Sequence, residues 1–165
     1  MQTRAIDLPH GSTIVVRPLV DGDISTVAAV FAGLGPESRR RWFDASKPCL
    51  SDDELACLAV VDTRHHVLVA YVAGDPEPAG LAQLARTGDH SAEVAFVVAD
   101  RYHQRGIGSA LTRLLLDDAR AAGITEVTTL ASGDNRAALA LLRRVASISE
   151  VRLEGPEQSI RAAIA

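Results

Sequence analysis

The stretch AEVAFVVADRYHQRGIGSAL, residues 92–111, contains the residues best suited to chemistry. Glu93 is a lone acid that precedes an apolar run, and a positioned carboxylate can take a proton from a reacting group. Gly106 and Gly108 follow the run, at the point where a helix is expected to begin. Glycines there let an anion reach the unpaired backbone N–H groups of the first helical turn. The stretch therefore predicts an anion site near a candidate base.

The glycine pair is compatible with more than one kind of site. A P-loop needs a lysine directly after its last glycine, and the chain has no such string. A dinucleotide fingerprint needs a third glycine, but Leu111 stands there. Glu126 lies 20 residues after Gly106, the spacing of a ribose-binding acid, yet it begins the next strand and so belongs to the opposite edge of the sheet. Two interpretations of the glycine pair remain. It forms either a tight turn without a ligand or a site for another phosphate-bearing molecule.

The elements that must position these residues follow from hydrophobic periodicity and turn residues. Ser51 and Glu54 have the spacing of a capping box, so a helix is expected to begin there. Asp21 or Asp23 is expected to cap an earlier helix, and Gly123 to end a later one. In chain order the sequence predicts a strand over 11–19, a helix over 21–34, a polar loop or short helix over 35–48, a helix from 51, strands over 65–74, 81–86 and 93–98, a helix over 107–122, a strand over 126–131, a helix after 135, and strands near 148–153 and 159–164.

The order of these elements indicates the fold class. Early strands are joined by hairpins, whereas strand–helix–strand units come late. The strand expected over 93–98 is continuously apolar after Glu93, which is typical of a central strand buried on both faces. We therefore expect an α/β fold of the α+β type, a mixed sheet with helices on its faces. The helix that begins at 107 carries the stripe of an amphipathic helix, formed by Ile107, Ala110, Leu111, Leu114 and Leu115.

Residues VVADRYHQRGIGSAL resemble the acetyl-CoA pyrophosphate loop of the GNAT superfamily of N-acetyltransferases. The usual pattern is glutamine or arginine, two residues, glycine, one residue, then glycine or alanine; here it falls on 103–108, with His103 in first place. The segment SGDNRAALALLRR is similar to the family's asparagine-bearing segment, with Asn135 at the matching position. The resemblance spans roughly residues 12–153. It implies the GNAT fold, with a mostly antiparallel central sheet flanked by helices and splayed at its central strands to hold acetyl-CoA.

The same resemblance implies a role for each part of the segment. Phe96, Val97 and Val98 would pair their backbones with the pantetheine arm, as an added strand would. Asn135 would lie near that arm. Arg105 is either a phosphate contact or a solvated side chain. The residues that would cradle the pyrophosphate are Gln104, Arg105, Gly106, Ile107, Gly108 and Ser109.

Glu93 has two interpretations. A glutamate that begins a strand is commonly just a solvated residue. However, AEVAFVV resembles the protein-lysine acetyltransferase branch, including histone acetyltransferases, whose general base is a glutamate at this position. The resemblance implies that Glu93 takes the proton from an amine during direct acetyl transfer. His90, three residues earlier, is a candidate to tune that acid.

The N-terminal half points to the acceptor. VVRPLVDGD, LGPESRRRWF and LSDDELACL resemble bacterial GNAT domains that acetylate acetyl-CoA synthetase and similar enzymes on lysine. The resemblance implies a protein lysine as acceptor, with a small-molecule amine as the alternative. Leu142 stands where many GNAT enzymes carry a tyrosine acid, and Ala146 and Ser147 stand in place of the usual Gly-Phe pair. These departures favour a second alternative, a non-catalytic CoA-binding regulatory module.

Composition narrows the remaining classes of function. The 165 residues suit one domain over 1–165, and a hydrophobic content of 47% is typical of globular proteins. A net charge of −4 argues against a nucleic-acid partner, and no apolar run approaches the length of a membrane span. Cys49 and Cys57 predict reduced thiols and no metal site. Because the first residues lack a secretory signal, we expect a cytoplasmic protein, either alone or as a homodimer.

Overall fold

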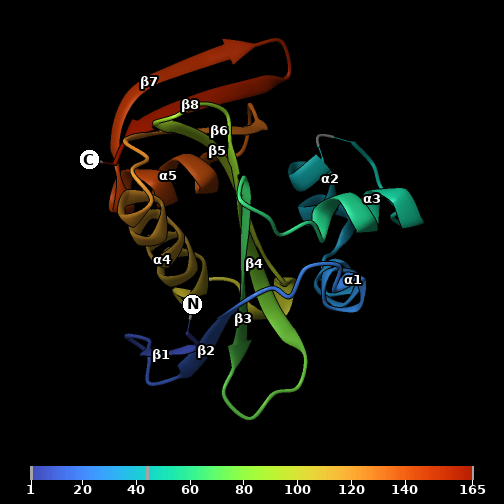
Figure 1. Cartoon of the computed structure of the whole chain (residues 1–165). Coiled ribbons are helices and arrows are strands. Elements are labelled where there is room, and N and C mark those ends of the chain that lie inside the picture. Colours follow the sequence, from blue (N-terminus) through green and yellow to red (C-terminus); the bar gives the residue numbers. More distant parts are fainter. Residues whose placement is uncertain (1, 44, 165) are drawn as a thin grey trace.

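The computed structural model describes residues 2–43 and 45–164 of the chain. Figure 1 shows how its strands and helices follow one another. In chain order the elements are β1 (Arg4–Asp7), β2 (Thr13–Pro18), α1 (Ile24–Ala32), α2 (Pro36–Phe43), α3 (Asp52–Leu58), β3 (His65–Val72), β4 (Pro78–Arg86), β5 (Ser91–Val98), a 3-10 turn (Asp100–Tyr102), α4 (Ile107–Ala121), β6 (Glu126–Ser132), α5 (Arg136–Val145), β7 (Ser147–Glu154) and β8 (Glu157–Ala163).

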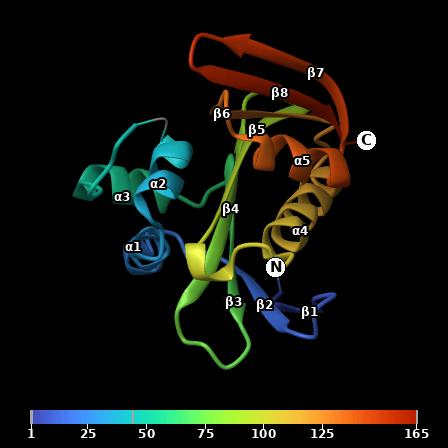
Figure 2. The same cartoon turned by 180° about the vertical axis from the view of Figure 1, so that it is seen from behind.

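The strands form one sheet in the order β1-β2-β3-β4-β5-β6-β8-β7. Neighbouring strands are antiparallel, except that β5 and β6 are parallel. Figures 1 and 2 show α1, α2 and α3 on one face of this sheet and α4 and α5 on the other. This arrangement confirms the expected mixed, mostly antiparallel sheet with helices on its faces.

Short-range signals set several helix ends as expected. The Asp23 carboxylate caps α1 by accepting a hydrogen bond from the Thr26 N–H at 3.1 Å. Ser51 and Glu54 form the predicted capping box at the start of α3. Gly123 follows α4 with a φ of +81°, a left-handed conformation that glycine adopts at helix ends without steric cost. Each signal acts within a few residues, which is why the sequence alone locates it.

The N-terminal half contains one strand that the sequence does not predict. β1 is a four-residue edge strand that pairs with β2. Both terminal nitrogens of Arg4 donate to the Asp118 carboxylate on α4, at 3.1 and 2.8 Å. The sequence leaves residues 35–48 as a loop or short helix, and the structure has the helix α2 at the start of that segment. Contacts with distant parts of the chain therefore decide both features.

Two hydrophobic cores attach the helices to the sheet. On one face α4 packs beneath the central strands, and its predicted stripe is confirmed, because Ile107, Leu111 and Leu115 are almost completely buried. On the other face Val30 and Phe31 of α1 pack against β3, β4 and β5. Each such side chain contributes about 1.5–3 kcal/mol when it is fully buried. The sheet is thus supported from both sides.

β5 and β6 pair over only three positions and then diverge. The last paired residues are Glu93 of β5 and Thr128 of β6. Beyond them, β5 remains paired with β4 as far as Val98, and β6 remains paired with β8 as far as Ser132. The sheet therefore opens between its central strands, as the family resemblance implies.

This divergence corrects the expectation that residues 93–98 are buried on both faces. Glu93 is exposed, and Ala95, Phe96 and Val98 are only half-buried. Strand β6 has diverged from β5 after Glu93, so the side chains of Ala95, Phe96 and Val98 border an opening. A continuous apolar run therefore does not show here that the strand is buried on both faces.

Candidate active site

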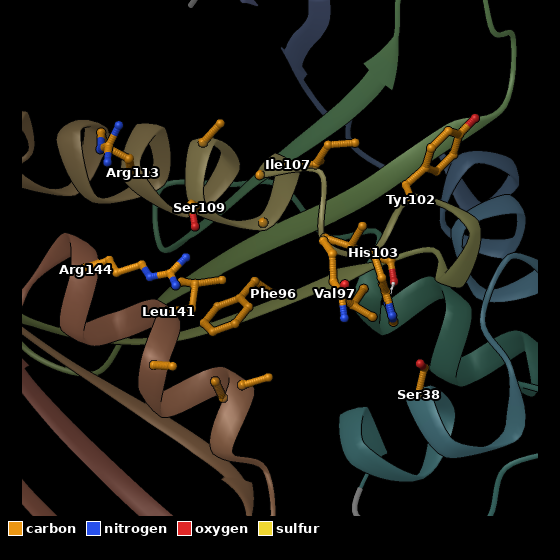
Figure 3. Close-up of a pocket in the computed structure, with 18 of the residues that line it drawn as sticks. Ser38, Phe96, Val97, Tyr102, His103, Ile107, Ser109, Arg113, Leu141 and Arg144 are labelled. Atoms are coloured by element: carbon orange, nitrogen blue, oxygen red, sulfur yellow. Dashed lines mark hydrogen bonds between the residues drawn. The ribbon is translucent and has the colours of Figure 1, made fainter. Parts of the chain in front are cut away.

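A cleft of about 1050 Å³ lies where β5 and β6 diverge. Its walls include residues 95–98 of β5, residues 129–131 of β6 and the facing sides of α4 and α5. Residues 6–10, which are the end of β1 and the turn after it, and part of α2 complete the lining. Figure 3 shows the side chains of this cleft. Segments from both halves of the chain therefore meet at one site.

The charged side chains of the cleft are mainly basic, although the whole chain carries a net charge of −4. Among the described lining residues, Asp7 is the single acid, and it accepts a hydrogen bond from the Thr13 hydroxyl at 2.7 Å. A concave surface lined by charge of one sign attracts ligands of the opposite sign. The cleft therefore suits an anion. The basic side chains that line it are His10, Arg41, His103, Arg113 and Arg144.

The loop before α4 has the backbone shape of an anion-binding nest. Gln104 has a φ of +61° and Gly106 a φ of +85°, and Arg105 between them has a negative φ. Alternation of this kind turns successive N–H groups toward one point. Gln104 is the one non-glycine residue in the described chain with a positive φ, a strained conformation of the kind that persists at functional sites.

The start of α4 adds further hydrogen-bond donors to this nest. Gly106 occupies the N-cap position, and no side chain caps the helix within the described chain. The first N–H groups of α4, from Ile107 to Ser109, are therefore open to a ligand. The positive end of the helix dipole acts in the same direction. Loop and helix together present backbone N–H donors at the position where the sequence predicts an anion site.

The two glycines of the motif are required for different physical reasons. Gly106 supplies the left-handed conformation, and a Cβ there would meet only Pro9 Cδ, at 3.8 Å. Gly108 supplies space, because a Cβ would lie 3.1 Å from Leu141 Cδ1 and 3.5 Å from Val98 Cγ2. The sequence predicts that both glycines let a phosphate reach the backbone, and the structure adds that Gly108 lies where α4 packs closely on α5.

His103, which departs from the family pattern, joins the loop to β5. Its Nε2 atom lies 2.8 Å from the Val98 carbonyl oxygen, so the ring donates a hydrogen bond to the end of the strand. Figure 3 places His103 beside Val97, at the end of the cleft nearer to Ser38. The side chain therefore positions the loop on the strand.

Arg105 does not line the cleft, unlike the other predicted cofactor residues. Its guanidinium carbon lies 5.5 Å from the centre of the Tyr102 ring. Tyr102 is buried, and its hydroxyl donates to Asp75. Burial and this hydrogen bond hold the pKa of Tyr102 above its ordinary value. The predicted residues that do line the cleft are Phe96, Val97, Val98, Gln104, Gly106, Ile107, Gly108, Ser109 and Asn135.

Asn135 serves as a helix cap. Its Oδ1 accepts a hydrogen bond from the Ala138 N–H at 3.1 Å, at the start of α5. Its backbone carbonyl accepts another from Gln158 Nε2, also at 3.1 Å. The same Gln158 nitrogen donates to the Ser132 carbonyl at 3.0 Å. Asn135 thus fixes the end of α5 that borders the cleft.

Glu93 stands at the vertex of the opening, on the face of the sheet that carries α1, α2 and α3. Side chains alternate along a strand, and Ala92 and Val94 belong to the core beneath α4. Glu93 therefore points to the other face. Its side chain is exposed and is not part of the cleft lining, which begins two residues later on β5 at Ala95. Leu142, at the family's tyrosine position, is fully buried.

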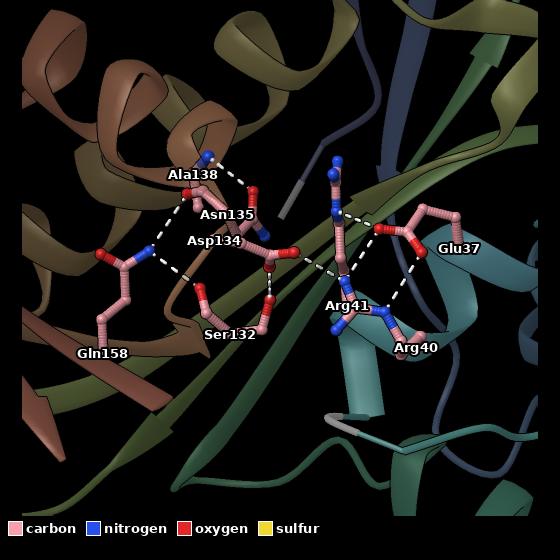
Figure 4. Close-up of polar contacts among 8 residues, drawn as sticks. All are labelled: Glu37, Arg40, Arg41, Ser132, Asp134, Asn135, Ala138 and Gln158. Atoms are coloured by element: carbon pink, nitrogen blue, oxygen red, sulfur yellow. Dashed lines mark hydrogen bonds and ion pairs between the residues drawn. The ribbon is translucent and has the colours of Figure 1, made fainter. Parts of the chain in front are cut away.

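A polar network crosses from α2 to the turn between β6 and α5. Arg40 donates to Glu37 at 2.8 Å and to Asp134 at 2.9 Å, and Asp134 accepts from the Ser132 hydroxyl. These contacts hold the pKa of Asp134 below its ordinary value, the Ser132 hydrogen bond being the largest cause. Figure 4 shows this network, with Arg41 beside it. α2 is thereby tied to the far wall of the cleft.

Sequence reasoning missed the basic residues on the outer side of the cleft. Arg113 follows Ser109 by four residues, which on a helix is about one turn, so its position could have been found. Arg144 and residues 6–10 carry no local signal of this kind. They reach the cleft only because α5 packs beside α4 and β1 joins the edge of the sheet.

The chain matches the family model described as the acetyltransferase (GNAT) family over residues 29–146. It is also similar to solved structures. For the GNAT domain of S. lividans PAT, the TM-score is 0.87 at 23% identity, over 98% of this chain and 96% of that one. For a cAMP-binding acyltransferase from Mycobacterium smegmatis, the TM-score is 0.68 at 23% identity, over 99% of this chain and 48% of that one. For spermidine N-acetyltransferase from Vibrio cholerae, in complex with CoA and spermine, the TM-score is 0.66 at 20% identity, over 91% and 94%.

The family match covers well over half of the chain, and the opened sheet and glycine loop agree with it. This chain belongs to the acetyltransferase (GNAT) family. It is an acyltransferase by family, and the resemblance stated from the sequence is confirmed. The solved structures share its fold. Within residues 2–43 and 45–164, no helix is both long and apolar enough to cross a membrane.

Proposed function

We propose that this chain transfers the acetyl group of acetyl-CoA to a primary amine, and that the acceptor is a protein lysine. The observation that carries the proposal is a basic cleft with a backbone anion nest, which runs toward an exposed carboxylate at the vertex of the opened sheet. Acetyl-CoA is an anion with a long, narrow arm, and it supplies an activated thioester.

The residues of the cleft fit such a molecule. The nest at 104–106 and the first N–H groups of α4 would hold the pyrophosphate. The edge of β5 that β6 leaves unpaired, residues 94–98, would hydrogen-bond to the pantetheine arm as an added strand does. An N–H group of the same edge would polarise the thioester carbonyl in the manner of an oxyanion hole.

Glu93 would act on the amine. A lysine amine has a pKa near 10.4, so that only about one in 2,500 is neutral at pH 7. Glu93 would take a proton from the attacking nitrogen, directly or through water, as the C–N bond forms and the C–S bond breaks. The thiolate would take up a proton from water, because Leu142 is buried and has no proton to give. Such a base typically supplies about 10²–10⁴-fold in rate.

Two observations support the choice of acceptor. AEVAFVV resembles the protein-lysine branch of the family, and the GNAT domain of S. lividans PAT has the same fold over nearly the full chain. The alternative is a small amine, and the similarity to a spermidine N-acetyltransferase favours it. The buried Leu142 favours a third function, a CoA-binding module without catalysis.

Calorimetry with acetyl-CoA, followed by thiol release with proteins and small amines as acceptors, tests the proposal. We expect binding, and turnover with a protein lysine that Glu93→Gln lowers at least tenfold without weakening acetyl-CoA binding. Glu157→Gln, an exposed acid on β8, is the control and should leave turnover unchanged. Turnover of small amines alone would favour the second function, and binding without any turnover the third. No binding would reject all three.

A further inference from the structure

Two arginines line the outer end of the cleft without an anionic partner. Arg113 stands on α4 and Arg144 in the last turn of α5, and both side chains are exposed. In Figure 3 both lie on the far side of Ser109 from His103, one on each helix. Neither forms a hydrogen bond or ion pair with any residue that the structure describes. The cleft thus ends in two uncompensated cations.

The acids that lie nearby are already engaged. Asp117 is one turn beyond Arg113 on α4, the spacing of a helical ion pair, yet its carboxylate pairs with Arg120 at 2.6 Å. Asp7, the acid of the described cleft lining, accepts the hydroxyl of Thr13. Charge on Arg113 therefore remains available to a ligand.

The end of α5 provides an internal comparison for Arg144. Arg143 and Arg144 are both in the last turn, where positive charge favours the helix dipole. Both are exposed, but only Arg144 lines the cleft. The helix dipole explains the charge at both positions, whereas the orientation toward the cleft distinguishes Arg144.

Spacing along α4 separates Arg113 from the pyrophosphate nest. Arg113 follows Ser109 by four residues, and a helix rises 1.5 Å per residue, so the two Cα positions are about 6 Å apart along the axis. In a nucleotide whose ribose carries both a pyrophosphate and a second phosphate, the distance between these two groups is of this order. Arginine recognises phosphate oxygens through paired charge-assisted hydrogen bonds.

We infer that Arg113 and Arg144 bind the 3′-phosphate on the ribose of CoA, a phosphate monoester distinct from the pyrophosphate. This inference rests on the proposed function. It extends that function by assigning the two phosphate groups of CoA to two different parts of the cleft. The backbone nest would bind the pyrophosphate of any such nucleotide. The arginine pair would select ligands that carry the additional monoester.

Calorimetry with CoA and 3′-dephospho-CoA tests the inference. The unaltered protein should bind CoA about tenfold or more tightly than dephospho-CoA, the size expected for charged hydrogen bonds. Arg113→Gln and Arg144→Gln should each reduce this ratio, and the double variant should bring it near one while dephospho-CoA affinity stays unchanged. Arg143→Gln is the matched control and should keep the ratio. Thermal unfolding checks that each variant is folded.

The outcomes separate this inference from the proposed function. CoA binding and amine acetylation with a ratio near one in the unaltered protein would overturn the arginine assignment alone. If the variants lost affinity for CoA and dephospho-CoA equally, the assignment would also be overturned, because the arginines would then act through general electrostatics. Failure of both ligands to bind would overturn the inference and the proposed function together.

Discussion

Arg40 and Asp134 are separated by 94 residues in the chain, and their side chains meet at 2.9 Å. The contact joins α2 to the turn between β6 and α5 (Figure 4), and α2 lies on the face of the sheet toward which the exposed Glu93 points. Arg40 also pairs with Glu37 within α2. The bond to Asp134 can therefore be removed while the helix retains its own ion pair.

Asp134→Asn should loosen α2 against the cleft and alter the acceptor side of the site. Because the pair is exposed, we expect a modest effect, an increase in acceptor KM of about two- to fivefold. The acetyl-CoA Kd should stay unchanged, because Asp134 does not line the cleft. Steady-state kinetics and calorimetry measure the two quantities. Asp117→Asn, which breaks a surface pair on α4, is the control, and an equal increase of KM in both variants would contradict the prediction.

Gly106→Ala should destabilise the protein and weaken acetyl-CoA binding together. Alanine must adopt the φ of +85° found at this N-cap, at a cost of roughly 1–2 kcal/mol. A shift of the loop to relieve that cost would misalign the N–H groups of the nest. Urea unfolding gives the first quantity and calorimetry the second. Unchanged stability would show that the left-handed conformation is dispensable.

Gly108→Ala should act through packing, and a second substitution should rescue it. The added Cβ would meet Leu141 Cδ1 at 3.1 Å, so the Leu141 side chain must shift by a few tenths of an ångström where α4 packs on α5. Shortening the partner in Gly108→Ala/Leu141→Ala removes the clash. A double-mutant cycle on the free energy of unfolding should therefore give a favourable coupling of about 0.5–3 kcal/mol. Additive losses would mean that these two residues do not compete for space.

Asp23→Ala should lower stability at neutral pH, and by less as the pH falls into the acid range. The pKa of Asp23 lies below its ordinary value, chiefly because the Thr26 hydroxyl donates to the carboxylate. A carboxyl whose pKa is lowered by folding stabilises the protein above its unfolded pKa of about 3.9, and this contribution is lost as the pH falls through the folded pKa. Loss of this helix cap should cost about 0.5–2 kcal/mol at pH 7.

Urea unfolding at pH 7 and pH 3 measures this difference. The gap between Asp23→Ala and the unaltered protein should be smaller at pH 3 than at pH 7, because pH 3 lies below the unfolded pKa and part of the contribution of the charged cap is lost there. Asp89→Asn, in an exposed turn, serves as the control and should show no gap at either pH. A gap that is constant between the two pH values would assign the effect to packing.

Residues that act on their near neighbours could be predicted from the sequence. Asp23, the Ser51–Glu54 box and Gly123 each set a helix end through contacts within a few positions. The stripe on α4 identified the helix face that is buried. The role of glycine and the free N–H groups at the start of α4 could be expected for the same reason, because both are local properties, whereas the positive φ of Gln104 was not predicted.

Tertiary structure alone decided where the remaining groups meet. The divergence of β5 and β6 after Glu93 left Ala95, Phe96 and Val98 only half-buried. Close approach of α5 to α4 made Gly108 a packing position and brought Arg144 to the cleft. The Arg40–Asp134 contact joined segments that no sequence pattern connects. These features depend on strand pairing and helix packing between distant residues, whereas caps, turns and amphipathic stripes depend on neighbours along the chain.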